Sequence, residues 1–210
     1  MGVKERRERD FRRREREILD AALRLLDGED WLSVTMEQIA DAAEVGKGTV
    51  YKHFASKEEL YARLSLQHFL ELQEALRGVG AELPLEERLR AMARVYWEVH
   101  NRPDICHHIV EYCEAEAFRR RMHPELRTRF EGIESAIYNQ IFAAIQEGME
   151  KGLFPPGPVR PLAMMARATL DGMIRMIRSG LLCAEDGEEQ LEAITGFILA
   201  GLAGGGSRAG

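Results

Sequence analysis

The chain has 210 residues, of which 45% are hydrophobic and 30% are charged, and its net charge is −6. No apolar run approaches the roughly 20 residues of a membrane-spanning helix, and the N-terminus, charged from Lys4 onward, lacks the apolar core of a secretory signal. The three cysteines are widely spread and odd in number, which argues against a disulfide framework and predicts a cytoplasmic protein without a membrane partner.

Helical periodicity recurs along the whole chain, whereas the alternation typical of strands is nearly absent. We therefore expect an all-α protein of about nine helices. The first is predicted from about residue 11 to 26, with Ile18, Ala22 and Leu25 on one face. Residues 1 to 16 hold eight basic and four acidic side chains. This basic arm predicts either supporting DNA contacts or a solvated helix end; its candidate arginines are Arg12, Arg13, Arg14 and Arg16.

Two capping boxes mark the next helices. Thr35 and Gln38 have the spacing at which a hydroxyl accepts from the third amide while the glutamine side chain reaches back. That box predicts a short helix ending near Ala43. Ser56 and Glu59 repeat the spacing and predict a long helix to about residue 77.

Between these helices lies a basic segment. Residues 45 to 57 contain three lysines and one histidine and no acidic side chain, although the chain is acidic overall. A local excess of positive charge is what a surface facing phosphates requires. In a helix over about residues 46 to 53, Val50 and Phe54 share one face and Gly48, Thr49 and Lys52 point elsewhere. The pattern predicts a helix-turn-helix whose second helix enters the major groove.

Longer helices follow a glycine-containing break at residues 78 to 80. The last two, about 161 to 179 and 188 to 203, are apolar over much of their circumference, which predicts burial against another subunit. We expect a DNA-binding domain at residues 1–55, a helical ligand-binding and dimerisation bundle at 56–203 and a disordered tail at 204–210.

The segment around residue 107 raises the possibility of a metal site. Its potential ligands are Cys106, His107, His108 and Cys113. Adjacent histidines diverge by about 100° on a helix, and no second pair at a recognised zinc spacing follows. Buried cysteines and surface histidines are the favoured interpretation. Because no nucleophile elbow, phosphate loop or paired acids occur, we expect neither an enzyme nor a cofactor.

The helix-turn-helix segment resembles a known family. Residues 35–43, 45–54 (VGKGTVYKHF) and 56–60 (SKEEL) resemble the N-terminal DNA-binding domain of TetR-family regulators. The resemblance covers about residues 11–62, and the remainder is similar only in the number and length of its helices. It implies a homodimer, joined through the last two helices, that binds double-stranded operator DNA and is most often a repressor released by a small-molecule inducer.

The resemblance also implies roles for single residues. Lys47, Gly48 and Thr49 fall where the family's recognition helix meets base edges. Tyr51 and His53 fall where it holds phosphates, and Lys52 can do either. Packing for Tyr51 and solvation for Lys52 are the alternatives. The remaining candidates are Thr35, as a cap, and Lys57, as added charge at the start of the fourth helix.

The body of such a regulator holds the inducer, so we expect an adaptable apolar pocket. The candidates, each of which also fits an ordinary core, are Met92, Tyr96, Trp97, Phe118, Phe130, Ile133, Ile137, Met165 and Met173. Arg119, Arg120 and Arg121 would suit the anionic head of a lipid-like ligand such as an acyl-coenzyme A, or form a solvated helix end.

The sequence is also compatible with two alternative functions. The ligand could be a cationic or aromatic drug and the regulated system an efflux pump. The chain could also be an acyl-binding or metal-binding protein that has kept a DNA motif without using it.

Overall fold

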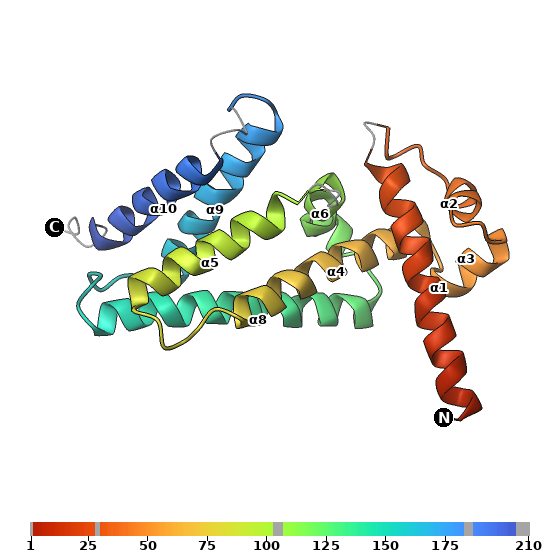
Figure 1. Ribbon diagram of the computed structural model, residues 1–210, viewed down its shortest axis with the longest axis horizontal. Helices are drawn as coiled ribbons and strands as arrows, with labels where there is room; N and C mark the ends of the chain where they lie inside the picture. Colours follow the sequence, from red (N-terminus) through yellow and green to blue (C-terminus); the bar gives the residue numbers. More distant parts are fainter. Residues whose placement is uncertain (1, 28–29, 103–106, 183–186, 205–210) are drawn as a thin grey trace. The chain divides into compact units, whose positions relative to one another are not determined.

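The computed structural model describes residues 2–27, 30–102, 107–182 and 187–204. These residues form ten helices and no strand (Figure 1), so the predicted all-α class is confirmed. The helices are α1 (Val3–Leu26), α2 (Met36–Ala42), α3 (Lys47–His53), α4 (Lys57–Arg77), α5 (Leu85–His100), α6 (His107–Glu114), α7 (Glu116–Arg119), α8 (Pro124–Glu150), α9 (Val159–Arg178) and α10 (Gly187–Gly204). The helix beyond the expected nine is the short α7. Within the described ranges, no helix combines the length and apolar character needed to cross a bilayer.

The chain folds into two compact units. One comprises Met1–His68 and Pro103–Phe130, and the other comprises Phe69–Arg102 and Glu131–Gly210. Helices α4 and α8 are each divided between the units: one segment of each helix belongs to the first unit and the other segment to the second.

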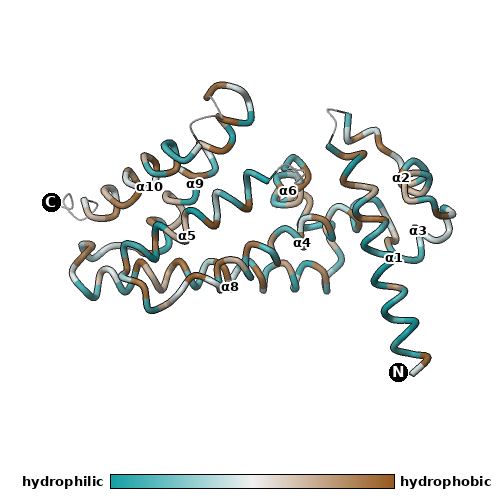
Figure 2. The backbone as a smooth tube through the Cα atoms, in the orientation of Figure 1, coloured by the Kyte–Doolittle hydropathy of each residue, from teal (hydrophilic) through white to brown (hydrophobic). Residues whose placement is uncertain are grey.

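Helix α1 begins at Val3, eight residues before the predicted start. Figure 2 shows that its N-terminal half is hydrophilic, and this half is exposed. Arginine and glutamate are good helix formers, and pairs three or four residues apart add small increments. Arg14 pairs with Glu17 at 2.8 Å, and the Gly2 amide donates to the Glu5 carboxylate at 3.0 Å. The basic arm is therefore a continuation of the helix.

The core of the first unit is built where α1 crosses α2 and α3. Ile18, Ala22 and Leu26 of α1 are fully buried, as is Ile39 of α2. Alanine at the crossing lets the backbones approach closely.

Both predicted helix starts are capped by side chains. Thr35 Oγ1 accepts from the Gln38 amide at 3.2 Å, and Gln38 Oε1 accepts from the Thr35 amide at 2.7 Å, which confirms the first capping box. At α4, Ser56 Oγ accepts from the Glu59 amide at 3.2 Å. The Glu59 carboxylate, however, accepts from the amide of Ala55 at 2.9 Å and not from that of Ser56. In this second capping box, the glutamate side chain therefore bonds the backbone amide one residue earlier than in the standard pattern.

An aromatic cluster joins the turn after α1 to α4 and α6 within the same unit. The Trp31 ring lies 5.0 to 5.6 Å, between centroids, from the rings of His108, Tyr112 and Tyr61. The Tyr61 hydroxyl donates to the Trp31 carbonyl at 3.2 Å. His108 Nε2 donates to the Leu26 carbonyl at 2.6 Å, so one of the last carbonyls of α1 is satisfied by a side chain of α6.

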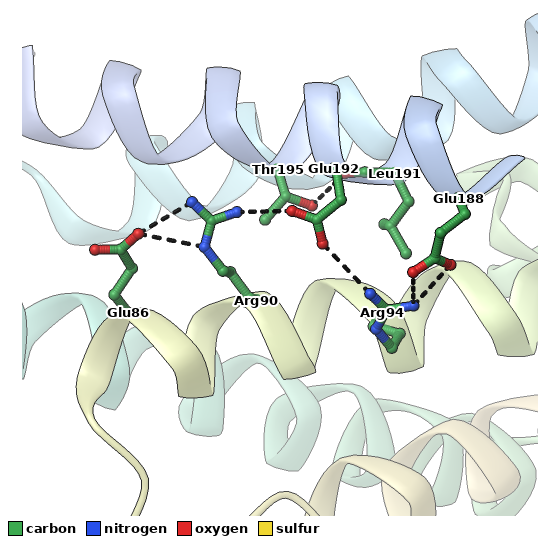
Figure 3. A network of polar contacts seen from close by, with 7 residues as sticks. All are labelled: Glu86, Arg90, Arg94, Glu188, Leu191, Glu192 and Thr195. Carbon is green, nitrogen blue, oxygen red and sulfur yellow. Dashed lines mark hydrogen bonds and ion pairs between the residues drawn. The ribbon is translucent and has the colours of Figure 1, made fainter. Parts of the chain in front are cut away.

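In the second unit α5, α9 and α10 pack against one another. Figure 3 shows the ion pairs between α5 and α10. Arg90 lies 3.2 Å from Glu192, and Arg94 lies 2.6 Å from Glu188 and 3.3 Å from Glu192. These side chains are partly exposed, so each pair contributes at most about 1 kcal/mol. Together they specify which turn of α10 faces which turn of α5.

Candidate DNA-binding surface and ligand cavity

The turn between α2 and α3 has a defined backbone geometry. The Glu44 amide donates to the Asp41 carbonyl at 3.1 Å and the Val45 amide to the Ala40 carbonyl at 3.0 Å. This pair of bonds is a Schellman motif, which requires a left-handed residue between them. Glu44 occupies that position with φ 52°. The turn therefore ends α2 sharply and directs the chain into α3.

Helix α3 has the two faces that the sequence predicted. Val50 is fully buried, as is Phe54 just beyond the helix, and both fix α3 on the core. The opposite face is exposed at Lys47, Gly48 and Lys52, and Tyr51 is 44% exposed. Thr49 is half-buried between the two faces.

The lysine at the start of α3 has a partner on α2. Lys47 Nζ forms an ion pair with the Glu37 carboxylate and lies 5.8 Å from the Tyr51 ring centroid. The hydrogen bond with Glu37 raises the pKa of Lys47 and lowers the pKa of Glu37. Since both groups are exposed, a base or phosphate can compete with Glu37 for the ammonium group.

Two other basic residues of this segment, His53 and Lys57, make internal contacts that the sequence did not reveal. Lys57 Nζ donates to the Leu32 carbonyl at 2.6 Å and lies 5.4 Å from the Tyr61 ring centroid. The His53 ring stacks on Phe11 at 3.9 Å, and burial lowers its pKa. Its place against Phe11 ties this end of α3 to α1.

The second unit contains a cavity of about 90 Å³ enclosed by α4, α5, α8, α9 and α10. Met92, Tyr96 and Ile137 line it, as predicted from the sequence. Most of the remaining wall is aliphatic. Leu76 and Leu89 are among its aliphatic side chains.

Three polar side chains of the wall, Tyr96, Tyr138 and Arg167, are connected through hydrogen bonds. The Tyr96 hydroxyl donates to Asp171, and Arg167 Nε donates to the same carboxylate at 3.1 Å. Arg167 also donates to the Tyr138 hydroxyl. Buried His100 stacks on Tyr96 at 3.9 Å, and burial lowers its pKa to about 4. This polar group joins α5, α8 and α9.

The sequence prediction missed Tyr138, Arg167 and Asp171. A signal for two of them exists, because Arg167 and Asp171 stand four residues apart on a helix whose other side chains are largely apolar. A charged pair on such a helix indicates a buried or ligand-facing position.

Comparison with known proteins places the chain among bacterial regulators. The sequence model of "Bacterial regulatory proteins, tetR family" matches residues 18–64, from α1 into α4. An uncharacterised helix-turn-helix regulator of Mycobacterium tuberculosis is 27% identical over 188 residues, 89% of this chain and 80% of its own length. TcmR of Streptomyces glaucescens is 43% identical over 54 residues, 26% of this chain and 24% of TcmR.

Residues 18–64 carry the DNA-binding domain of the TetR family. Solved structures of bacterial transcriptional regulators extend the likeness to about nine tenths of the chain. PfmR of Thermus thermophilus is 25% identical and superposes with a TM-score of 0.68 over 88% of this chain and 98% of PfmR. FadR of Bacillus subtilis, solved in complex with stearoyl-CoA, has a TM-score of 0.64 at 21% identity over 90% of this chain and 97% of FadR. At 21% identity, the similarity to FadR shows a shared fold and nothing further.

Several residues that the sequence predicted for the ligand pocket do not line the cavity. Phe118 and Phe130 are buried in the first unit. Trp97 is buried beside Tyr96 but is turned by about 100° around α5. Met165 points outward from α9 and is 59% exposed. The remaining two, Ile133 and Met173, are also absent from the cavity wall.

The arginine cluster after α6 belongs to the first unit and lines no part of the cavity. Arg119 Nε donates to the Glu114 carbonyl at 3.1 Å, with its guanidinium 5.2 Å from the Phe130 ring centroid. Arg120 pairs with Glu116 at 2.5 Å, and Arg121 donates to the Tyr112 hydroxyl at 3.3 Å. The three side chains thus have partners within their own segment.

The potential metal ligands are similarly occupied where they are described. Cys106 lies outside the described residues. His107 is buried, and His108 bonds the carbonyl at the end of α1. Cys113 is buried, and burial raises the pKa of its thiol to about 12, so the thiol is unreactive at neutral pH.

Proposed function

We propose that this chain is a homodimeric, ligand-responsive transcriptional repressor that binds a palindromic operator. The exposed face of α3 carries the proposal. It presents Lys47, Gly48, Tyr51 and Lys52 on a helix held by Val50 and Phe54. A recognition helix requires this combination of a fixed inner face and a polar outer face.

The proposed contacts divide along α3. Lys47, Gly48 and Thr49, in its first turn, would meet base edges in the major groove. Tyr51 and Lys52 would bind phosphates, and phosphate contacts fix the register of the protein on the duplex. The other three candidates support these contacts: Thr35 by capping α2, His53 by its stack on Phe11, and Lys57 by its bond to the Leu32 carbonyl.

The proposed dimer forms through α9 and α10. Phe197 is 70% exposed on α10, and Met165 is 59% exposed on α9. Both line one apolar groove together with side chains such as Leu162 and Ile198. Large apolar groups that form a contiguous exposed surface mark interaction sites. Two copies joined here would present two recognition helices to half-sites about 34–36 Å, or a multiple, apart.

We propose the functional division of the chain as a DNA-binding domain at residues 1–55, a ligand-binding and dimerisation domain at 56–203 and a tail at 204–210. The inducer would occupy the cavity of the second unit. It would release DNA by binding better to the state with low operator affinity, a coupling of typically about 1–3 kcal/mol.

An acyl-coenzyme A is the first candidate inducer. The cavity wall is mostly aliphatic, and the fold is shared with FadR of B. subtilis, which was solved with stearoyl-CoA. This candidate predicts that acyl-coenzyme A releases operator DNA and that the matching free fatty acid does so less well.

A cationic or aromatic drug is the second candidate. Glu134 contributes a carboxylate to the cavity wall, and an aromatic ligand could stack on Tyr138. This candidate predicts release by a lipophilic cation and no response to acyl compounds.

The test of the proposed function begins with selection of bound fragments from genomic DNA by the purified protein. The recovered operator is then titrated with Thr49→Ala and Lys52→Ala, with Lys151→Ala on the turn after α8 as the matched lysine control. We expect Thr49→Ala to relax the base preference at one position and Lys52→Ala to weaken all sequences alike. Recovery of no enriched sequence by a folded protein would refute the proposal.

A further inference from the structure

The cavity of the second unit has polar side chains in its wall, and these already have partners within the fold. The Tyr96 hydroxyl donates to Asp171. Arg167 donates to the same carboxylate at 3.1 Å and to the Tyr138 hydroxyl. Tyr138 and Arg167 each take part in further interactions as well. A ligand that sought a hydrogen bond from these groups would therefore compete with existing bonds.

The other two polar side chains of the wall are also engaged. The Thr195 hydroxyl donates to the Leu191 carbonyl of its own helix at 2.6 Å. Glu134 takes part in an interaction of its own. The rest of the wall is apolar and comes from all five helices, with side chains such as Leu72 on α4 and Ile198 on α10.

Such a wall disfavours a polar ligand atom. That atom would lose its hydrogen bonds to water on entry, and a wall group could bind it only by giving up a bond that the fold already makes. A buried polar group without a partner is costly, and an unpaired buried charge is more so. A hydrocarbon group meets neither cost and gains from leaving water.

The volume limits how much hydrocarbon this structure can take. A cavity of about 150 Å³ in another protein stays dry and binds benzene or xenon, and this one measures about 90 Å³. The enclosed group is therefore short, and Met92 in the wall is the side chain best able to adapt to a longer one.

We propose that the cavity receives a short hydrocarbon group of the inducer and no polar atom of it, so that recognition there depends on shape and apolar contact. The proposal rests on the proposed ligand response and specifies its chemistry. Of the two candidate inducers, an acyl-coenzyme A meets the requirement when the end of its acyl chain enters the cavity. A drug whose cationic group had to enter the cavity does not.

The first test uses four small probes with the full-length protein, measured by NMR titration and thermal shift. Isobutene and acetone have nearly the same shape and differ by a methylene group against a carbonyl oxygen, while acetate and isopropylammonium carry charge. We expect isobutene to bind at least about tenfold more tightly than each of the other three. Equal or tighter binding by any polar probe, or no binding of isobutene, would overturn the proposal.

A crystal under xenon pressure locates the site directly, because xenon is an apolar probe of dry cavities. We expect xenon beside Met92 and Ile137. A cavity that takes up no xenon would contradict the proposal.

Two variants change the volume of the cavity in opposite directions. Ala93→Leu extends a wall side chain into it and should weaken isobutene binding by about tenfold or more. Ala143→Leu, the same change at an exposed alanine of α8, is the matched control and should leave binding unchanged. Met92→Ala enlarges the cavity, so the folded variant should bind benzene at least about tenfold more tightly than the unmodified chain does.

A third variant tests whether a polar wall group takes part. Thr195→Val keeps the shape and removes the hydroxyl, and isobutene affinity should stay within about twofold. Circular dichroism and melting temperature establish that each variant is folded. Undiminished isobutene binding in folded Ala93→Leu, or no gain of benzene binding in folded Met92→Ala, would refute the site.

Operator binding is measured separately on ligand-free protein. If isobutene binds selectively but no operator is found, the cavity assignment stands and the repressor proposal fails. If the operator binds but isobutene does not, only the cavity assignment fails.

Discussion

Helices α3 and α10 each leave a large face uncovered in the single chain, and the two faces differ in chemistry. The uncovered face of α3 carries lysines, a tyrosine and a glycine. The uncovered face of α10 carries Phe197, continued on α9 by Met165. A polar face stays hydrated without a partner and exchanges water for phosphates when DNA binds. An apolar face gains from any partner that removes it from water, by about 25 cal/mol per Å².

The difference determines how each face responds to mutation. The phosphate and base contacts proposed for α3 would be separate hydrogen bonds, so we expect the loss of any one of them to have a moderate effect. An apolar interface depends on a few buried anchors, and losing a central one can abolish association.

The largest effect is expected from Phe197→Arg. A buried arginine without a partner at the α10 face should dissociate the dimer, and operator affinity should fall by about 100-fold or more because only one half-site is then bound at a time. Analytical ultracentrifugation and fluorescence anisotropy measure the two quantities. Leu32→Arg, at an exposed leucine of the first unit, should remain dimeric. A dimeric Phe197→Arg protein would place the interface elsewhere.

Acidification should lower the free energy of unfolding through buried His100 of the second unit. The pKa of His100 is about 4 in the folded chain, below its unfolded value of 6.5, so the unfolded state binds the proton first as pH falls. Stability due to neutral His100 is complete above pH 6.5 and is lost between 6.5 and about 4, by about 3 kcal/mol in total. Urea unfolding at several pH values should show a shallower loss for His100→Gln than for the unmodified chain. Parallel curves for the two proteins would contradict this assignment.

A smaller effect is expected on the polar face. Thr49→Ala should cost about 1–3 kcal/mol at the one base pair it contacts, and Lys52→Ala should reduce the salt dependence of binding by about one unit of slope. Both variants should remain dimeric. Dissociation of either would mean that the two faces are not independent.

The smallest effect concerns the turn that positions α3. Glu44 has φ 52°, a conformation that costs a residue with a side chain about 1–2 kcal/mol and glycine almost nothing. Glu44→Gly should therefore stabilise the chain by up to about 1 kcal/mol, measured by urea unfolding, with unchanged operator affinity. Glu44→Ala keeps the strain and should show no such gain.

Local patterns predicted the region around α2 and α3 well. The Thr35 box, the inward Val50 and Phe54 and the exposed Lys52 all follow from spacings of three or four residues, and each was found. The ion pair of Lys47 with Glu37 and the Schellman turn at Glu44 were missed. The first depends on how two helices cross, and the second places glutamate where glycine is usual.

The cavity was predicted only in part, because its wall is assembled from five helices that lie far apart in the sequence. Met92, Tyr96 and Ile137 were found by their type, yet Trp97 and Met165 have the same type and face elsewhere. The charge of Arg119 suits an anionic ligand, but in the fold its Nε donates to the Glu114 carbonyl and its guanidinium lies over the Phe130 ring. The polar wall residues Arg167 and Tyr138 were identified only from the structure.

The chain has two tryptophans, and one lies in each compact unit. Trp31 is packed on His108 and two tyrosines in the first unit, and Trp97 is buried beside Tyr96 in the second. Replacing either one by phenylalanine leaves a single tryptophan as the intrinsic fluorophore. Emission from the Trp97→Phe protein then comes from the first unit, and emission from the Trp31→Phe protein comes from the second. The molecule thus carries its own pair of optical reporters, with which the order of ligand binding and DNA release can be timed without a label.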